Sequence, residues 1–151
     1  MTKAIKIAII EDDPIISQMY RAKFETEDFD VQVAGDGKSG VQLVENFLPD
    51  IVLMDIKMPE MNGDEALKAI RKNKWGKDIP VIVLTNTSKE EAPAELENLN
   101  VADYIVKAEF TPSQVVAAVK NVIAWRIRAK NKLCMFFRDE EALSRPIGEI
   151  T

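Results

Sequence analysis

Acidic, hydroxyl and ammonium side chains follow four of five short apolar segments in this 151-residue sequence. The acids Glu11–Asp13 come after the first segment, Asp55 after the third, Thr85 after the fourth and Lys107 after the fifth. Converging carboxylates repel one another unless a cation lies between them, and Mg²⁺ with oxygen ligands removes that cost. A carboxylate beside Mg²⁺ and an ammonium can attack phosphorus. These residue types predict a phosphoryl-aspartate site if the five segments bring them together.

The five apolar segments are typical of strands buried on both faces of a sheet, because they are short, β-branched and nearly continuous. They span residues 5–10, 31–34, 51–54, 81–84 and 104–106. Helical patterns follow each one, from Pro14, over about 39–47, 63–72 and 88–99, and from Pro112 onward. Strands that alternate with helices pair in parallel through right-handed crossovers. The sequence therefore predicts a doubly wound α/β fold with a five-stranded parallel sheet.

In open sheets of this kind, ligands bind beyond the carboxyl ends of the strands, near the point where the strand order reverses. All the residues named above stand at such strand ends. Each alone has an ordinary structural explanation, as a helix cap, a turn residue, a strand end or a solvated charge. Their joint placement favours a shared site.

Four stretches of the sequence resemble a known family. They are IIEDDP at 9–14, PDIVLMDIKMPEMNG at 49–63, VIVLT at 81–85 and DYIVK at 103–107. On these motifs, residues 1–124 resemble a response-regulator receiver domain of two-component signalling. The resemblance implies the flavodoxin-like strand order 2-1-3-4-5 and a phosphoacceptor protein in a phosphorelay. It does not imply an enzyme that acts on other substrates.

The resemblance assigns a role to each residue of the acidic cluster. Asp55 would accept a phosphoryl group from a partner histidine kinase or phosphotransfer protein. Asp12 would bind Mg²⁺ directly, Glu11 through water, and the main-chain carbonyl of Lys57 would complete the protein ligands. Asp13 is expected to cap the following helix before Pro14, and a ligand role for Asp13 is the alternative.

Thr85 and Tyr104 resemble the family's switch pair. The Thr85 hydroxyl would bond the new phosphoryl oxygen, Lys107 would pair with it, and the Tyr104 ring would rotate into the vacated space. This change would alter the face formed by helix four, strand five and helix five, where a downstream output protein binds. The alternative for Tyr104 is a core aromatic residue with a hydrated hydroxyl.

The sequence departs from the family pattern around the phosphorylation site. Ala108 follows Lys107, where the family usually has a proline in a cis peptide, so a trans peptide and a changed reach of Lys107 are expected. Asn86 replaces a small residue after Thr85 and is expected to narrow access to the phosphate. Lys57 adds a cation at the mouth of the site.

Other functions remain open from the residues themselves. Gly35, Gly37 and Gly40 match G-x-G-x-x-G, the dinucleotide fingerprint, but the preceding strand is expected at the sheet edge, where the glycines would serve a turn. An aspartyl-phosphate phosphatase needs a second acid where Lys57 stands. A flavodoxin-like carrier is disfavoured, since Glu11–Asp13 would repel a flavin phosphate. A receiver-like binding module that is never phosphorylated is a further alternative.

Composition excludes several classes of site. Histidine is absent, which excludes imidazole metal sites, Ser-His-Asp and Cys-His nucleophiles and a phosphohistidine in this chain. The single cysteine, Cys134, excludes an intramolecular disulfide and fits a reducing compartment. No apolar run approaches the ~20 residues of a membrane span, and signal-peptide features are lacking. We therefore expect a cytoplasmic protein without a membrane span.

We expect residues 125–151 to form a second region, a C-terminal helical extension without a separate effector domain. They hold six basic and four acidic residues. Residues 1–124, in contrast, carry a net charge of -7, and this negative charge argues against direct DNA binding. The helical stripe continues through Val122, Trp125, Ala129, Leu133 and Phe136. A homodimer through this helix, a docking segment for a partner, contact with anionic lipid, and a longer last helix with a frayed end are the alternatives.

Overall fold

The computed structural model describes residues 3–135 of the chain. The strands are β1 (Lys6–Ile10), β2 (Asp30–Ala34), β3 (Ile51–Met54), β4 (Val81–Thr85) and β5 (Val101–Val106). The α-helices are α1 (Pro14–Thr26), α2 (Gly37–Phe47), α3 (Gly63–Arg71) and α4 (Pro112–Met135). Short 3₁₀ segments are η1 (Lys89–Glu91), η2 (Ala94–Asn98) and η3 (Lys107–Glu109).

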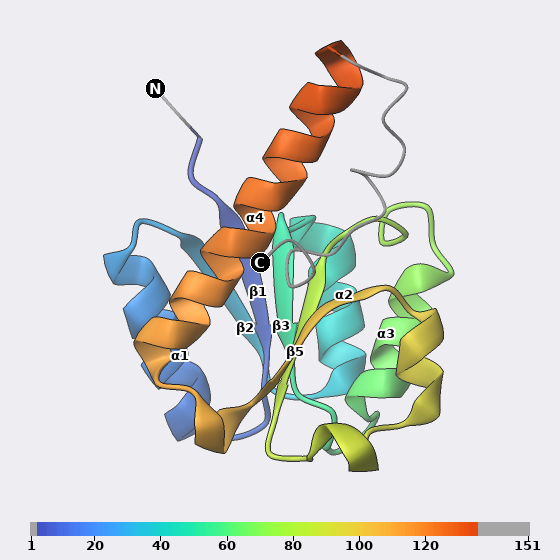
Figure 1. Cartoon of the computed structure of the whole chain (residues 1–151). Helices are drawn as coiled ribbons and strands as arrows, with labels where there is room; N and C mark the ends of the chain where they lie inside the picture. Colours follow the sequence, from blue (N-terminus) through green and yellow to red (C-terminus); the bar gives the residue numbers. More distant parts are fainter. Residues whose placement is uncertain (1–2, 136–151) are drawn as a thin grey trace.

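The strands form one parallel sheet in the order β2-β1-β3-β4-β5. This order confirms the predicted doubly wound fold, and all carboxyl ends of the strands lie at the same edge of the sheet (Figure 1). Predicted and observed strands agree closely, except that β5 begins at Val101, three residues earlier than expected. A register irregularity between Val81 and Ile82 accompanies the pairing of β4 with β5.

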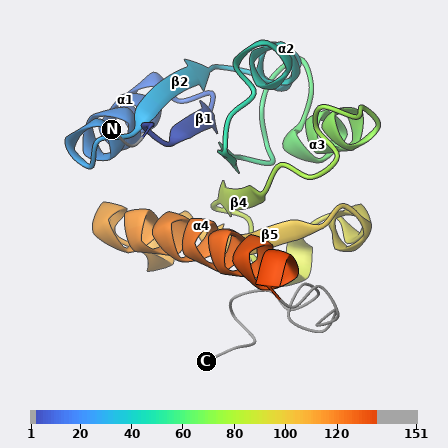
Figure 2. The ribbon, with the colours of Figure 1, turned by 90° about the horizontal axis from the view of Figure 1, so that it is seen from above.

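Helices cover the sheet on both faces (Figure 2), and each face has its own apolar core. Phe24 of α1 and Val119 of α4 pack with strand residues such as Ile9 on one face. Val44 of α2 and Leu67 of α3 pack with the opposite strand side chains on the other. Because the strands are covered on both sides, they need the continuous apolar runs that the sequence shows.

The helix predicted over residues 88–99 is absent, and this prediction was wrong. The segment contains η1 and η2, separated by Ala92 and Pro93. Ala92 is extended, with φ −65° and ψ 148°. A proline disfavours the helical conformation of the residue before it and removes a backbone donor, so Pro93 divides the segment. The expected signalling face therefore consists of two 3₁₀ segments with β5 and the last helix, α4.

The extended C-terminal helix is present as α4, which rises past the amino ends of the strands (Figure 1). It continues without a break through residue 124, and the division into 1–124 and 125–151 stays a prediction. Phe136 and the remainder of the predicted tail lie outside the described residues, as does the side chain of Leu133. Over residues 3–135, no helix combines the length and apolar character needed to cross a bilayer.

Candidate functional site

Three acidic side chains meet where β1 and β3 end side by side at the centre of the sheet. Glu11 and Asp12 follow β1, and Asp55 follows β3. One carboxylate oxygen of each lies within 4.8 Å of the others. Glu11 and Asp55 are buried, whereas Asp12 is exposed. The parallel topology thus produces the predicted cluster at the position expected for a ligand site.

Lys107 reaches this cluster from the end of β5. Its ammonium donates to Glu11 Oε1 at 2.5 Å and to Asp55 Oδ2 at 2.9 Å. The peptide between Lys107 and Ala108 is trans, since no cis peptide occurs in residues 3–135. The missing proline therefore does not prevent Lys107 from contacting Asp55.

The surroundings of Glu11 and Asp55 move their pKa values in opposite directions. Burial and a hydrogen bond with Asp55 raise the pKa of Glu11 to about 7, although Lys107 acts to lower it. Burial also acts to raise the pKa of Asp55, but interactions with Glu11, Lys107 and Thr85 outweigh it and hold that pKa below its usual value. Asp55 is therefore an ionised carboxylate near neutral pH, which a nucleophile requires.

The acidic cluster fits a small divalent cation. Glu11 Oε2 is the one buried side-chain oxygen or nitrogen in the described part of the chain without a hydrogen-bond partner. Such an atom is costly to bury, and a cation with oxygen ligands satisfies it. Asp13 has a different task, because its Oδ1 accepts from the backbone N–H groups of Ile15 and Ile16 at the start of α1. The predicted capping role of Asp13 is confirmed, and the metal-ligand role of Asp12 stays a prediction.

Thr85 and Tyr104 are connected through the main chain of Thr87. The backbone N–H of Thr87 donates to Thr85 Oγ1 at 3.3 Å. The Tyr104 hydroxyl donates to the Thr87 carbonyl oxygen at 2.8 Å. The sequence analysis missed Thr87, because a main-chain bridge leaves no residue-type signal. Thr87 thus links the buried hydroxyl beside Asp55 to the partly exposed ring.

The loop after β3 shapes the mouth of the site. Lys57 is exposed there, and Asn86 on the neighbouring loop is exposed as well. Gly63 opens α3 with its N–H donating to the Ile56 carbonyl at 2.6 Å. A Cβ at residue 63 would lie 2.0 Å from the Asp55 carbonyl oxygen, so only glycine permits this approach. The role of the Lys57 carbonyl as a metal ligand stays a prediction.

The glycines of the G-x-G-x-x-G pattern serve packing at the start of α2. A Cβ at Gly37 would lie 2.1 Å from the carbonyl oxygen of Met61, and one at Gly40 would lie 2.7 Å from the Ile10 side chain. Gly35 lies in the bend between β2 and α2, as expected of a turn residue, although no glycine in residues 3–135 has a positive φ. The preceding strand β2 is at the sheet edge, as predicted.

Comparisons with known proteins agree with this geometry. The model of the response regulator receiver domain family matches residues 7–120. The regulatory protein AtoC of Escherichia coli K12 is 34% identical over 107 residues, covering 71% of this chain and 23% of AtoC. The DNA-binding response regulator MtrA of Mycolicibacterium smegmatis is 32% identical over 116 residues, covering 76% of this chain and 49% of MtrA. The chain therefore spans about a quarter to a half of the length of these relatives.

The solved structures include a CheY-like response regulator receiver domain protein from Methanospirillum hungatei JF-1. It matches with a TM-score of 0.77 and 24% identity over 84% of this chain and 99% of that protein. This likeness establishes the fold, while the family match covers most of the sequence. The acidic cluster, the ammonium and the hydroxyl occupy the strand ends that the sequence motifs indicated. The chain belongs to the response regulator receiver domain family.

Proposed function

We propose that Asp55 accepts a phosphoryl group from a phosphohistidine on a partner histidine kinase or phosphotransfer protein. The observation that carries the proposal is the Asp55 carboxylate, bonded to Lys107 at 2.9 Å and grouped with Glu11 and Asp12. The phosphohistidine lies outside residues 1–151, because this sequence has no histidine.

The transfer needs an ionised, oriented carboxylate. Asp55 Oδ1 accepts from the backbone N–H of Ile56 at 2.7 Å, and Oδ2 accepts from Lys107, so the group is fixed in direction. An Asp55 oxygen forms a bond to phosphorus while the phosphorus–nitrogen bond of the donor breaks, and the imidazole nitrogen keeps that electron pair. Lys107 neutralises charge on the transferring group. In the later hydrolysis, water attacks the phosphorus of the acyl phosphate, inorganic phosphate leaves, and the Asp55 carboxylate is restored.

Receiver domains generally use Mg²⁺, and this chain has suitable ligands for it. Asp12, Asp55 and the Lys57 carbonyl would bind the ion directly, and Glu11 through water. The orphaned Glu11 Oε2 supports this assignment. When bound, Mg²⁺ supplies positive charge that reduces the repulsion among the carboxylates and neutralises negative charge on the phosphoryl oxygens.

Thr85 and Tyr104 transmit the phosphorylated state. A phosphoryl group on Asp55 attracts the Thr85 hydroxyl, and movement of Thr85 disturbs its bond from the Thr87 N–H. Because Tyr104 donates to the same Thr87 peptide unit, its ring responds. The surface of β5, α4 and residues 88–99 then changes for a downstream output protein.

The chain acts as a signalling protein, and catalysis is limited to its own phosphorylation and dephosphorylation. A homodimer through the long helix α4 also belongs to the proposal. Sedimentation velocity tests it. A single monomeric species across the concentration series, with and without beryllofluoride, would count against the dimer.

The central test is Mg²⁺-dependent labelling of the chain by a small phosphodonor, with beryllofluoride as a stable analogue. Asp55→Asn should abolish labelling, because the amide is not nucleophilic. Asp30→Asn, at the amino end of β2, is the matched control and should label normally. Undiminished labelling of Asp55→Asn would overturn the proposal.

A further inference from the structure

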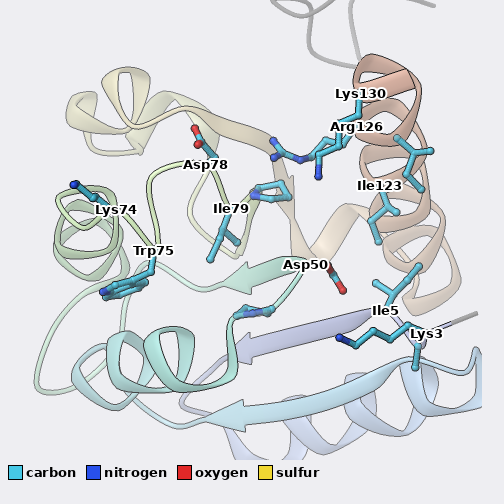
Figure 3. Close-up of a pocket in the computed structure, with 14 residues that line it drawn as sticks. Lys3, Ile5, Asp50, Lys74, Trp75, Asp78, Ile79, Ile123, Arg126 and Lys130 are labelled. Carbon is cyan, nitrogen blue, oxygen red and sulfur yellow. The ribbon is translucent and has the colours of Figure 1, made fainter. Parts of the chain in front are cut away.

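A hollow of about 430 Å³ lies at the amino ends of the strands, at the edge of the sheet opposite Asp55. Figure 3 shows it between α4 and the loop that follows α3. Trp75 and Ile79 of that loop and Ile123 and Ile127 of α4 give it an apolar lining. The phosphorylation chemistry uses none of these residues.

The rim of the hollow is basic. Lys3, Lys74, Arg126 and Lys130 border it, and Figure 3 shows Arg126 and Lys130 projecting from α4. Across residues 3–130, none of the four forms an ion pair with a carboxylate.

The acids around the hollow leave this positive charge largely uncompensated. Asp50 and Asp78 are the acidic residues that line it. The Asp50 carboxylate already accepts from the backbone N–H of Lys6 at 2.8 Å. An acidic segment with apolar side chains is therefore the complementary occupant.

We propose that the chain's own segment 136–151 occupies this hollow. The segment begins with Phe136 and Phe137, continues with the acidic run 139–141, and holds four acidic and two basic residues in total. The two aromatic rings match the apolar floor, and the acidic run matches the ammonium and guanidinium groups of the rim. A tethered segment also binds at a high effective concentration.

The chain is long enough for this contact. Segment 136–151 follows Met135, the last residue of α4, and Ile123 lies about 18 Å back along that helix at 1.5 Å per residue. Sixteen extended residues span about 50 Å. A segment that turns back after α4 is therefore long enough to reach Trp75. Its binding leaves the Asp55 edge free, because the two sites lie at opposite ends of the strands.

The test places a nitroxide on the segment and follows the Trp75 indole N–H by NMR in the full chain. Cys134→Ser removes the single cysteine, Ala142→Cys carries the label, and Trp125→Phe removes the other tryptophan. The label should broaden the Trp75 signal. The added pair Arg126→Glu and Lys130→Glu should restore it, whereas the matched pair Lys38→Glu and Arg128→Glu should leave it broadened.

Mixing settles which chain supplies the segment. An isotope-labelled chain without nitroxide is combined with a nitroxide-bearing chain that carries no isotope. Broadening of the Trp75 signal in this mixture would place a second copy's segment in the hollow and overturn the proposal, which requires broadening only when the label and the isotope share a chain. No broadening in any sample, or equal broadening in both charge-reversal pairs, would also overturn it. If the Arg126 and Lys130 changes unfold the chain, added salt replaces them, and the proposal requires the Trp75 signal to recover.

Discussion

Among the single residues of the site, the Lys107 ammonium forms ion pairs with two buried carboxylates. Lys107 bonds Glu11 and Asp55 together, and the exposed Asp12 adds a further negative charge beside them. One cation among three carboxylates leaves the cluster negative when Glu11 is ionised. The site is therefore suited to a divalent cation. The positive charge of that ion would offset the carboxylates and, later, the phosphoryl oxygens.

Mutations of the neighbouring acids Asp12 and Asp13 should have different effects, one on Mg²⁺ affinity and the other on stability. Asp12→Ala should weaken Mg²⁺ binding roughly tenfold or more, since it removes a ligand. Asp13→Ala should leave Mg²⁺ affinity nearly unchanged and cost about 1 kcal/mol of folding free energy, because it removes the cap of α1. Magnesium titration followed by intrinsic fluorescence, together with thermal unfolding, measures both quantities. A larger loss of affinity in Asp13→Ala would reverse the assignment.

Thr85 and Lys107 should prove necessary for transmitting the signal and less necessary for receiving it. Thr85→Ala and Lys107→Ala should still accept a phosphoryl group on Asp55, more slowly in the lysine variant, because the nucleophile remains. Beryllofluoride should then cause a much smaller NMR shift at Tyr104 than in the parent. Thr26→Ala, at the exposed end of α1, is the matched control. A full shift at Tyr104 in both variants would show that the switch runs elsewhere.

The sequence predicted the charged residues of the site because each is adjacent to a strand whose apolar run is unmistakable. It did not predict how far Lys107 reaches, since this depends on the backbone after β5, where Ala108 replaces the family's proline. It did not reveal Thr87 either. That contact uses only main-chain groups, which every residue type except proline supplies in full.

Among the secondary-structure elements, the segment between β4 and β5 is the one for which the apolar spacing of the sequence predicted the wrong structure. Its apolar spacing resembled a helix, but Pro93 stands in the middle and Ala92 before it is extended. Leu96 is nevertheless buried against the core of α2 and α3. The buried Leu96 side chain therefore holds this segment against the core, although the segment is not a continuous helix.

Removal of this proline should lengthen the helical structure. Pro93→Ala restores a backbone donor and relieves a penalty of about 3 kcal/mol for proline inside a helix. We expect residues 89–98 to gain α-helix, detected as a stronger helical signal in far-ultraviolet circular dichroism and as helical NMR chemical shifts. Pro112→Ala is the control, because Pro112 stands at the first position of α4, where proline is tolerated. An unchanged 3₁₀ pattern in Pro93→Ala would mean that tertiary packing, and not Pro93, breaks the helix.

At the scale of the whole molecule, the two ends of the sheet differ in how they are held. The carboxyl end carries the charged cluster around Asp55. The amino end of β4 and β5 is fastened by Arg71 of α3, whose guanidinium donates to five main-chain carbonyls. The acceptors are Leu99 at 2.8 Å, Asn100 at 3.2 Å, Gly76 at 2.8 Å, Lys77 at 3.4 Å and Ile79 at 2.6 Å. One side chain thus joins the loop after α3 to the entry of β5.

Loss of Arg71 should destabilise the whole domain, because Arg71→Ala removes the donor to the partly buried carbonyls of Leu99, Gly76 and Ile79. We expect a loss of about 2–4 kcal/mol in the free energy of unfolding, measured by urea denaturation. Arg71→Lys should recover only part of it, since an ammonium cannot present the guanidinium's fork to both loops. Arg21→Ala is the matched control, with a surface bond to Glu25 worth about 0.5 kcal/mol or less. Equal losses in Arg71→Ala and Arg21→Ala would show that solvent, and not Arg71, satisfies these carbonyls.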